Sequence, residues 1–189
     1  MTQNDFPKSV STAKGDYDLR SLDMNDAKRI LAFANDLPAH DLLYLRRDIS
    51  KPPVVDAWLT ATKEGESLSV VAERDGEMLG MSALMLDRKS WSPHVGEIRV
   101  LIAKDARGQG LGRLLIQETF ALAVSNGIEK IIAQMTLDQL GARAVFEELG
   151  FQQEALLKEH VRDRNGDDHD IIIMSCNVAS AAARLGTFH

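Results

Sequence analysis

Cysteine and positive charge are both scarce in this chain. Its 189 residues include a single cysteine, Cys176, so no internal disulfide can form, and a reducing, cytoplasmic compartment is expected. Lys and Arg number 22 against 28 Asp and Glu, which leaves a net charge of -6. Because no excess of cations is available to neutralise phosphates, we expect no general affinity for nucleic acid or for an anionic membrane.

Long apolar runs are absent too. No stretch of about eighteen consecutive apolar residues occurs, and the polar N-terminus lacks the apolar segment of a signal peptide. The length suits one well-buried core. We therefore expect a single domain over residues 16–178, preceded by a disordered segment over residues 1–15 and followed by a C-terminal tail over residues 179–189.

The helices are predicted by local signals. Asp23 precedes apolar residues spaced i, i+3, i+4, i+7 and is placed to cap a helix that ends before Pro38. Ser50, two residues before a proline pair, marks a second helix start. Apolar segments over residues 111–125 and 139–149 predict two further helices.

Strand-like runs occupy most of the remaining chain. The dipeptides Asp75-Gly76 and Asn165-Gly166 accept positive φ and predict two tight hairpins. Strands are expected over residues 16–22, 67–73, 77–86, 95–103, 130–135, 151–162 and 168–176. The resulting order, βααβββαβαββ, predicts an α/β (α+β) fold with a mixed, mostly antiparallel twisted sheet flanked by helices.

Three glycines lie between two apolar segments in the stretch DARGQGLGRLL, residues 105–115. The stretch follows a predicted strand and opens a predicted helix, where exposed backbone N–H groups and the helix dipole favour anions. Arg107 and Arg113 add positive charge on either side. The combination predicts a phosphate site, with a pyrophosphate as the expected ligand.

Other interpretations of the glycines are weaker. A turn that only permits close helix packing is the alternative, but three glycines within five residues exceed what a turn needs. The spacing matches neither GxxxxGK[ST] nor GxGxxG, which disfavours a nucleotide triphosphatase or a dinucleotide-binding enzyme.

Two motifs carry a family resemblance. Residues 107–112, RGQGLG, match the R/Q-x-x-G-x-G/A signature of the GNAT N-acetyltransferase superfamily, in the family's position after a strand and at a helix start. Residues 139–151, QLGARAVFEELGF, are similar to the family's N-x-x-A-x-x-L-Y-x-x-L-G-F segment. The order of elements agrees as well, and the resemblance covers roughly residues 18–176.

The resemblance implies an N-acetyltransferase with acetyl-CoA as co-substrate and without a metal. The backbone amides of residues 107–112 would hold the pyrophosphate of CoA, and the pantetheine arm would pair with the preceding strand. From Glu97 to Ala103 that strand spans roughly 20 Å at about 3.3 Å per residue, enough for the extended arm. The implied CoA-binding residues are Val100, Leu101, Ile102, Arg107, Gly108, Gln109, Gly110, Leu111, Gly112, Arg113, Gln139 and Phe146.

Attack of an amine on a thioester calls for a base, because an amine with a pKa of about 10.4 is almost fully protonated at neutral pH. Glu97 is the candidate base on the strand over residues 95–103, where strand alternation puts it on one face with Arg99. An ordinary ion pair with Arg99 is the alternative role. For the oxyanion, a backbone N–H near Leu101 or Ile102 is the expected donor.

Two positions depart from the family's motif. The tyrosine that the family uses as general acid is replaced by Phe146, which has no proton to donate, and its asparagine is replaced by Gln139, which keeps an amide. A thiol is a tolerable leaving group as thiolate, so losing the acid is expected to cost on the order of 100-fold in rate. A GNAT-like acyl-CoA-binding sensor or scaffold with weak catalysis is the alternative function.

The acceptor is left open by the sequence. A primary amine of a small molecule or of a protein would serve, and the helices over residues 23–62 are expected to shape its pocket. Residues 167–170, DDHD, are interpreted as a solvated turn and not as a metal site. His160 and His169 are expected on opposite arms of the last hairpin as structural or surface residues. A homodimer is compatible with the sequence.

Overall fold

The computed structural model describes residues 6–185, with side chains through residue 181. Eight strands of these residues form one sheet in the order β1-β2-β3-β4-β5-β6-β8-β7. The strands are β1 (Lys8–Thr12), β2 (Gly15–Ser21), β3 (Ser67–Arg74), β4 (Glu77–Leu86), β5 (Val95–Ile102), β6 (Lys130–Thr136), β7 (Gln152–Arg162) and β8 (Asp168–Asn177). The helices are α1 (Ala27–Asp36), α2 (Pro52–Lys63), α3 (Leu111–Ser125), α4 (Leu140–Glu148) and α5 (Val178–Leu185), with short 3-10 turns η1 (Met24–Asp26), η2 (Ala39–Leu42) and η3 (Lys104–Ala106).

One neighbouring pair of strands is parallel, and it opens along its length. The other neighbouring pairs are antiparallel. β5 and β6 run parallel and are paired from Val95 opposite Lys130 to Ile98 opposite Ala133. The pairing ends there, although β5 continues to residue 102 and β6 to residue 136. The two strands therefore leave an opening at their C-terminal ends.

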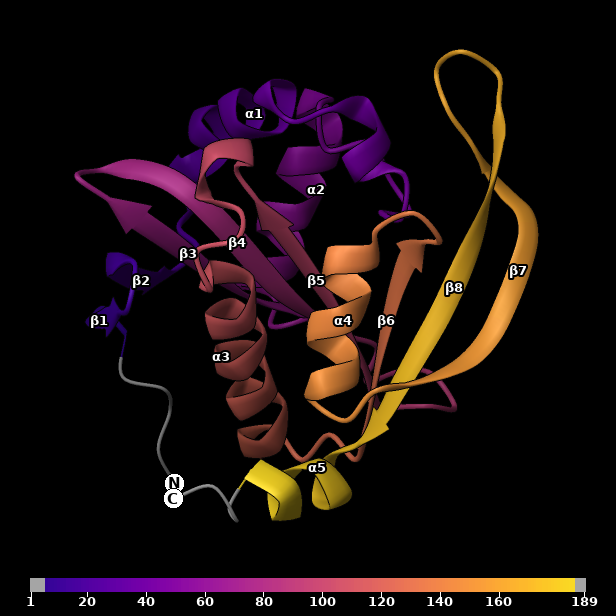
Figure 1. Cartoon of the computed structure of the whole chain (residues 1–189). Helices are drawn as coiled ribbons and strands as arrows, with labels where there is room; N and C mark the ends of the chain where they lie inside the picture. The colour runs from indigo at the N-terminus through magenta and orange to yellow at the C-terminus, as the bar shows by residue number, and fades with distance from the viewer. Residues whose placement is uncertain (1–5, 186–189) are drawn as a thin grey trace.

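Side chains on the two faces of the sheet pack into separate hydrophobic cores. In β3, Val70 packs in a cluster with residues of α3, whereas the next residue, Val71, packs with α1 and α2. In β8, Ile171 and Ile172 divide between the two faces in the same way. Figure 1 shows α3 and α4 in front of the sheet and α2 behind it, with α1 above. This division follows from the two-residue period of strand side chains.

The predicted fold class is confirmed by the mixed, mostly antiparallel sheet with helices on both faces. Asp75 and Gly76 have φ of 52° and 80°, as a tight hairpin turn requires. The side chain of Asp23 caps the first helical turn, as predicted. The start of α2 differs slightly, because its N-cap is Lys51 and not Ser50.

The expectation of disorder over residues 1–15 is wrong for residues 8–12, which form β1 against β2. β1 contains one aliphatic residue, Val10, and its side chains alternate between half-buried and exposed. Apolar periodicity therefore carried no signal, and the strand is held by backbone pairing at the sheet edge. Residues 1–5 of the expected segment lie outside the described residues.

The expected tail over residues 179–189 begins instead inside a helix, α5. Val178 and Ala181 are buried in the same core cluster as residues of α3 and β8. Alanine is the strongest helix former, so the alanine-rich composition favours a helix wherever one apolar face can be buried. Residues 186–189 lie outside the described residues.

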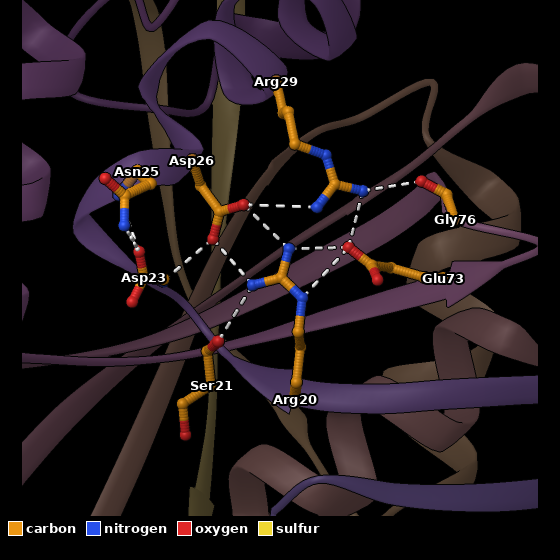
Figure 2. A network of polar contacts seen from close by, with 8 residues as sticks. All are labelled: Arg20, Ser21, Asp23, Asn25, Asp26, Arg29, Glu73 and Gly76. Atoms are coloured by element: carbon orange, nitrogen blue, oxygen red, sulfur yellow. Dashed lines mark hydrogen bonds and ion pairs between the residues drawn. The ribbon is translucent and has the colours of Figure 1, made fainter.

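An ion-pair network joins the first helical turn to the sheet behind it (Figure 2). Arg20 on β2 donates through both terminal nitrogens to Asp26 at 2.7 Å, and through one of them to Glu73 on β3 at 2.6 Å. Arg29 on α1 contacts the same two carboxylates. Burial alone would raise the pKa of Asp26, but the hydrogen bonds from Arg20 and from the Asp23 N–H outweigh it and lower that pKa.

Candidate functional site

A cavity of about 580 Å³ lies where β5 and β6 separate. Its walls come from the C-terminal halves of these strands, from α4, from the loop between β5 and α3, and from the segment after α1. The volume is typical of a small-molecule site. A cavity at the opening of a sheet, beside a helix N-terminus, is therefore the candidate functional site.

The backbone of β5 faces this cavity at every second residue. The N–H of Ala103 bonds to a carbonyl oxygen of β4, and successive residues of a strand present their N–H and C=O groups to opposite sides. The groups of Val100 and Ile102 therefore face the opening, and the carbonyl oxygen of Val100 accepts a hydrogen bond from Tyr44 there. Leu101, which was predicted to supply a backbone contact, turns its N–H toward β4 instead.

Two glycines with left-handed backbone shape the loop between β5 and α3. Gly108 and Gly110 have φ of 68° and 85°, and a Cβ at either position would meet no other atom within 4 Å. Both line the cavity, and Gly110 is the N-cap of α3. Because glycine adopts this conformation at little cost, the chain can turn sharply and bring the positive end of the α3 dipole to the cavity wall.

Most of the predicted CoA-binding residues line the cavity. They are Val100, Leu101, Ile102, Arg107, Gly108, Gly110, Gly112, Arg113, Gln139 and Phe146. Gln109 turns its side chain back to the carbonyl oxygen of Asp105, at 2.7 Å, and Leu111 is fully buried in the core beneath the start of α3. Both remain predicted contacts through their backbone amides alone.

Glu97 does not line the cavity, although the next residue, Ile98, does. Its carboxylate is 9 % exposed, accepts a hydrogen bond from Arg99 Nε at 2.8 Å and lies 3.6 Å from Arg46 Nη2. The ion pair with Arg99, the alternative role considered from the sequence, is therefore present. The role of Glu97 as general base stays a prediction.

The two positions that depart from the family's motif both reach the cavity. Gln139 occupies the N-cap position of α4, and its Oε1 accepts a hydrogen bond from the N–H of Thr136 at 3.3 Å. Phe146 is buried and packs edge to face against Phe151, with ring centroids 4.9 Å apart. Position 146 thus supplies an apolar wall without a proton donor.

A tyrosine from outside the motif also lies in the cavity. Tyr44 follows η2, in the segment between α1 and α2, and its hydroxyl donates to the carbonyl oxygen of Val100. Its side chain is buried, and burial raises the pKa of Tyr44 far above its usual value. The phenol therefore keeps its proton at neutral pH.

Two pairs of histidine and aspartate meet beside the cavity. His40 Nε2 lies 2.7 Å from Asp138 Oδ2, and His169 Nε2 lies 3.1 Å from Asp163 Oδ2. The two imidazole rings contact edge to face, with centroids 5.1 Å apart. Burial alone would raise the pKa of Asp138, but hydrogen bonds from the Thr136 hydroxyl, from its own backbone N–H and from His40 outweigh it and lower that pKa. Asp138 is therefore an ionised partner for the imidazole of His40.

Sequence analysis assigned no role to these groups. His40 and Tyr44 lie in an irregular segment, where no periodicity tells which way a side chain points. His169 was interpreted as a structural or surface residue, and its contact with His40 joins elements far apart in the chain. The only local signal that could have linked them is the spacing of four residues between His40 and Tyr44. That spacing occurs between many residues that share no function.

Within residues 6–185, no group of three or more His, Cys, Asp or Glu side chains is arranged to hold a metal ion. In the same part of the chain, the longest apolar helices fall short of what crossing a membrane requires.

The sequence was compared with models of known protein families. Residues 32–151, more than half of the chain, match the model of the "Acetyltransferase (GNAT) family". The matched segment runs from α1 to the residue before β7. It therefore contains β5, α3, β6 and α4, the elements that surround the cavity.

Solved structures of GNAT and N-acetyltransferase proteins share the fold. An acetyltransferase of the GNAT family from Streptococcus pneumoniae superposes with a TM-score of 0.73 at 19% identity, over 85% of this chain and 99% of that one. A ribosomal-protein-alanine N-acetyltransferase from Brucella melitensis gives 0.71 at 22% identity, over 84% and 98%. A spermidine N-acetyltransferase from Vibrio cholerae, in complex with CoA and spermine, gives 0.73 at 19% identity, over 88% and 98%.

Proposed function

Since the chain belongs to the acetyltransferase (GNAT) family, we propose that it is a cytoplasmic enzyme that transfers an acetyl group from acetyl-CoA to a primary amine. One observation carries the proposal. The cavity begins at a glycine loop on the N-terminus of α3 and continues along a strand edge of β5 whose backbone groups face the opening.

Acetyl-CoA suits this cavity in shape and in chemistry. The amides of residues 107–112 would hold the pyrophosphate, where the helix dipole favours an anion. Val100 and Ile102 present backbone donors and acceptors that match the amides of an extended pantetheine arm. Gln139 supplies a further amide at the opposite wall, and Phe146 an apolar surface.

The reaction needs three things from this site. The amine must be neutral when it attacks the carbonyl carbon of the thioester, the developing oxyanion must be stabilised, and the sulfur must leave when the C–S bond breaks. The N–H of Val100 faces the opening and would serve the oxyanion. Removing one preorganised donor of this kind typically costs a factor of about 100 to 1000 in rate.

The acceptor is proposed to be an amine of a small molecule or of a protein. The similar structures include an enzyme named for spermidine and one named for an alanine of a ribosomal protein, so this fold serves amines of both classes. In this chain, Asp41 and Asp138 line the cavity and would attract an ammonium group. Glu97 is the base that the sequence predicts for removing its proton.

The proposal is tested by thiol release from acetyl-CoA with a panel of polyamines, amino acids and peptides with free amino termini. Acetylation of at least one amine, identified by the mass of its product, is the expected result. Acetyl-CoA should also raise the melting temperature of the protein more than ATP does. Stabilisation by ATP alone would overturn the proposal.

A second candidate function is an acyl-CoA-binding sensor or scaffold with weak catalysis. Phe146 favours it, because the position has no proton to donate. This function predicts acetyl-CoA binding without transfer to any amine, in the natural chain and in Phe146→Tyr alike. Transfer to any amine by the natural chain decides for the enzyme.

A further inference from the structure

We propose that His40 and Tyr44, both from the segment between α1 and α2, are the proton acceptor and the proton donor of the acyl transfer. The inference rests on the proposed acetyltransferase function and adds two catalytic residues to it. In this arrangement the phenol of Tyr44 replaces the donor that position 146 lacks.

The side chains of His40 and Tyr44 reach the opening of the sheet at the same position along strands β5 and β6. Continuing the parallel register of β5 and β6 past Ile98 and Ala133 places residue 100 level with residue 135 and residue 101 level with residue 136. Tyr44 binds the carbonyl oxygen of Val100 on the β5 side. His40 Nε2 lies 3.5 Å from Thr136 Oγ1 on the β6 side. A thioester lying along β5 between these strands would therefore pass between a phenol and an imidazole.

The contact with Asp138 holds His40 in a tautomer that can accept a proton. The ionised carboxylate of Asp138 can only accept a hydrogen bond, so at 2.7 Å it holds the proton of His40 on Nε2. Nδ1 is then left with a free lone pair. The side chain of His40 is 33 % exposed, which gives an accepted proton a way to solvent.

Several charged groups surround His40. Asp138 faces it from the loop after β6, and His169 faces it from β8 with Asp163 behind. Asp41 follows it in η2 and is paired with Arg107, from the loop before α3. The carboxylates stabilise the imidazolium that forms during the reaction.

Tyr44 is prepared to donate a proton. Its hydrogen bond to Val100 holds the buried hydroxyl at the strand edge that faces the opening. The same residue, Val100, presents its N–H to the opening for the oxyanion. The donor and the oxyanion contact are therefore positioned by one residue of β5.

The proton balance closes within the site. The amine nitrogen forms a bond to the carbonyl carbon and gives one proton to His40 Nδ1, the C–S bond breaks, and the sulfur takes the proton of Tyr44. The products are an N-substituted acetamide and free CoA thiol. The imidazolium of His40 and the phenolate of Tyr44 then return to their neutral forms by one proton transfer, directly or through water, so no further reactant is consumed.

The test measures acetyl transfer to the best amine of the panel by thiol release. The variants are His40→Gln, whose amide can still bond to Asp138, and Tyr44→Phe, which removes one oxygen. The matched control is His160→Gln. His160 is an exposed histidine on the β7–β8 hairpin, whose other histidine, His169, faces His40. Melting temperature and acetyl-CoA affinity are measured for every variant, so that a folding or binding defect is separated from a loss of chemistry.

We expect kcat to fall on the order of 100-fold in His40→Gln and in Tyr44→Phe, with little change in the KM for acetyl-CoA. His160→Gln should keep the kcat of the natural chain. Adding Phe146→Tyr to Tyr44→Phe should restore part of the lost kcat, because it returns a phenol to the family's position.

Two results would overturn the inference while leaving the acetyltransferase intact. One is unchanged kcat in both His40→Gln and Tyr44→Phe. The other is an unchanged kcat in His40→Gln together with a loss of about 100-fold in Glu97→Gln, which would assign the base to Glu97. If the natural chain binds acetyl-CoA but transfers acetyl to no amine, the proposed function itself fails, and the inference with it.

Discussion

A guanidinium nitrogen of Arg107 lies 2.5 Å from a carboxylate oxygen of Asp41, which ties the glycine loop before α3 to the 3-10 turn η2. The residue before Asp41, His40, is tied to Asp138 on the opposite wall of the cavity. Consecutive residues of η2 thus contact both walls of the opening between β5 and β6. The segment between α1 and α2 is therefore a third wall of the candidate site.

Replacing Asp41 with Asn should tighten acetyl-CoA binding. The carboxylate competes with the pyrophosphate for Arg107 and repels it, so its removal should lower the Kd about two- to fivefold, with a smaller effect at high salt. Titration calorimetry at two salt concentrations measures this. Asp36→Asn makes the same charge change at an exposed position at the end of α1 and should leave the Kd unaltered. Weaker binding by Asp41→Asn would mean that the ion pair positions Arg107 for the ligand.

Gly110→Val should abolish acetyl-CoA binding in a folded protein. The left-handed backbone at this position costs a β-branched residue about 1–2 kcal/mol, and the new side chain would occupy the cavity beside the α3 N-terminus. Gly127→Val has a similar φ of 71° and open space around it but lies away from the cavity-lining residues, so it should lose stability alone. Thermal unfolding and binding titrations separate the two effects. Equal affinities of the two variants would show that the loop is only a turn.

Asp26→Asn should destabilise the fold by about 3 kcal/mol at pH 7, because it leaves the guanidinium of Arg20 with one carboxylate partner in a largely buried site. The folded-state pKa of Asp26 lies below the ordinary value of 3.8. The stabilisation is therefore full above pH 3.8 and is lost as the pH falls through the folded-state pKa. Denaturant unfolding at pH 7 and pH 3 should show the difference between natural chain and variant shrinking at the lower pH. A constant difference would contradict the network's electrostatic role.

Trp58→Phe should cost about 1–2 kcal/mol of stability. The indole Nε1–H lies 3.1 Å from the hydroxyl oxygens of both Ser67 and Ser69, which are buried on β3, and phenylalanine leaves them without this donor. Trp91→Phe is the matched control, because Trp91 is fully exposed in the loop after β4 and should change stability by less than about 0.5 kcal/mol. Urea midpoints of the two variants measure the contrast.

Much of the cavity wall proposed to hold acetyl-CoA could be predicted from the sequence, because its signals are local. A glycine at position 110 is needed for a left-handed N-cap, and the position of the loop between a strand and a helix follows from apolar periodicity on either side. The edge strand β1 was missed because backbone pairing, unlike side-chain periodicity, leaves little trace in a sequence.

The sequence alone determined the order of the main elements from β2 to β8, the hairpin turns between them and the glycine loop, since each depends on residues a few positions apart. Only the tertiary structure decided what faces that loop across the cavity. Tyr44 meets Val100 56 residues away, and His40 meets Thr136 96 residues away. Such contacts depend on how the segment between α1 and α2 packs over the opening of the sheet. That packing is set by the burial of its apolar side chains against distant strands, which no local pattern encodes.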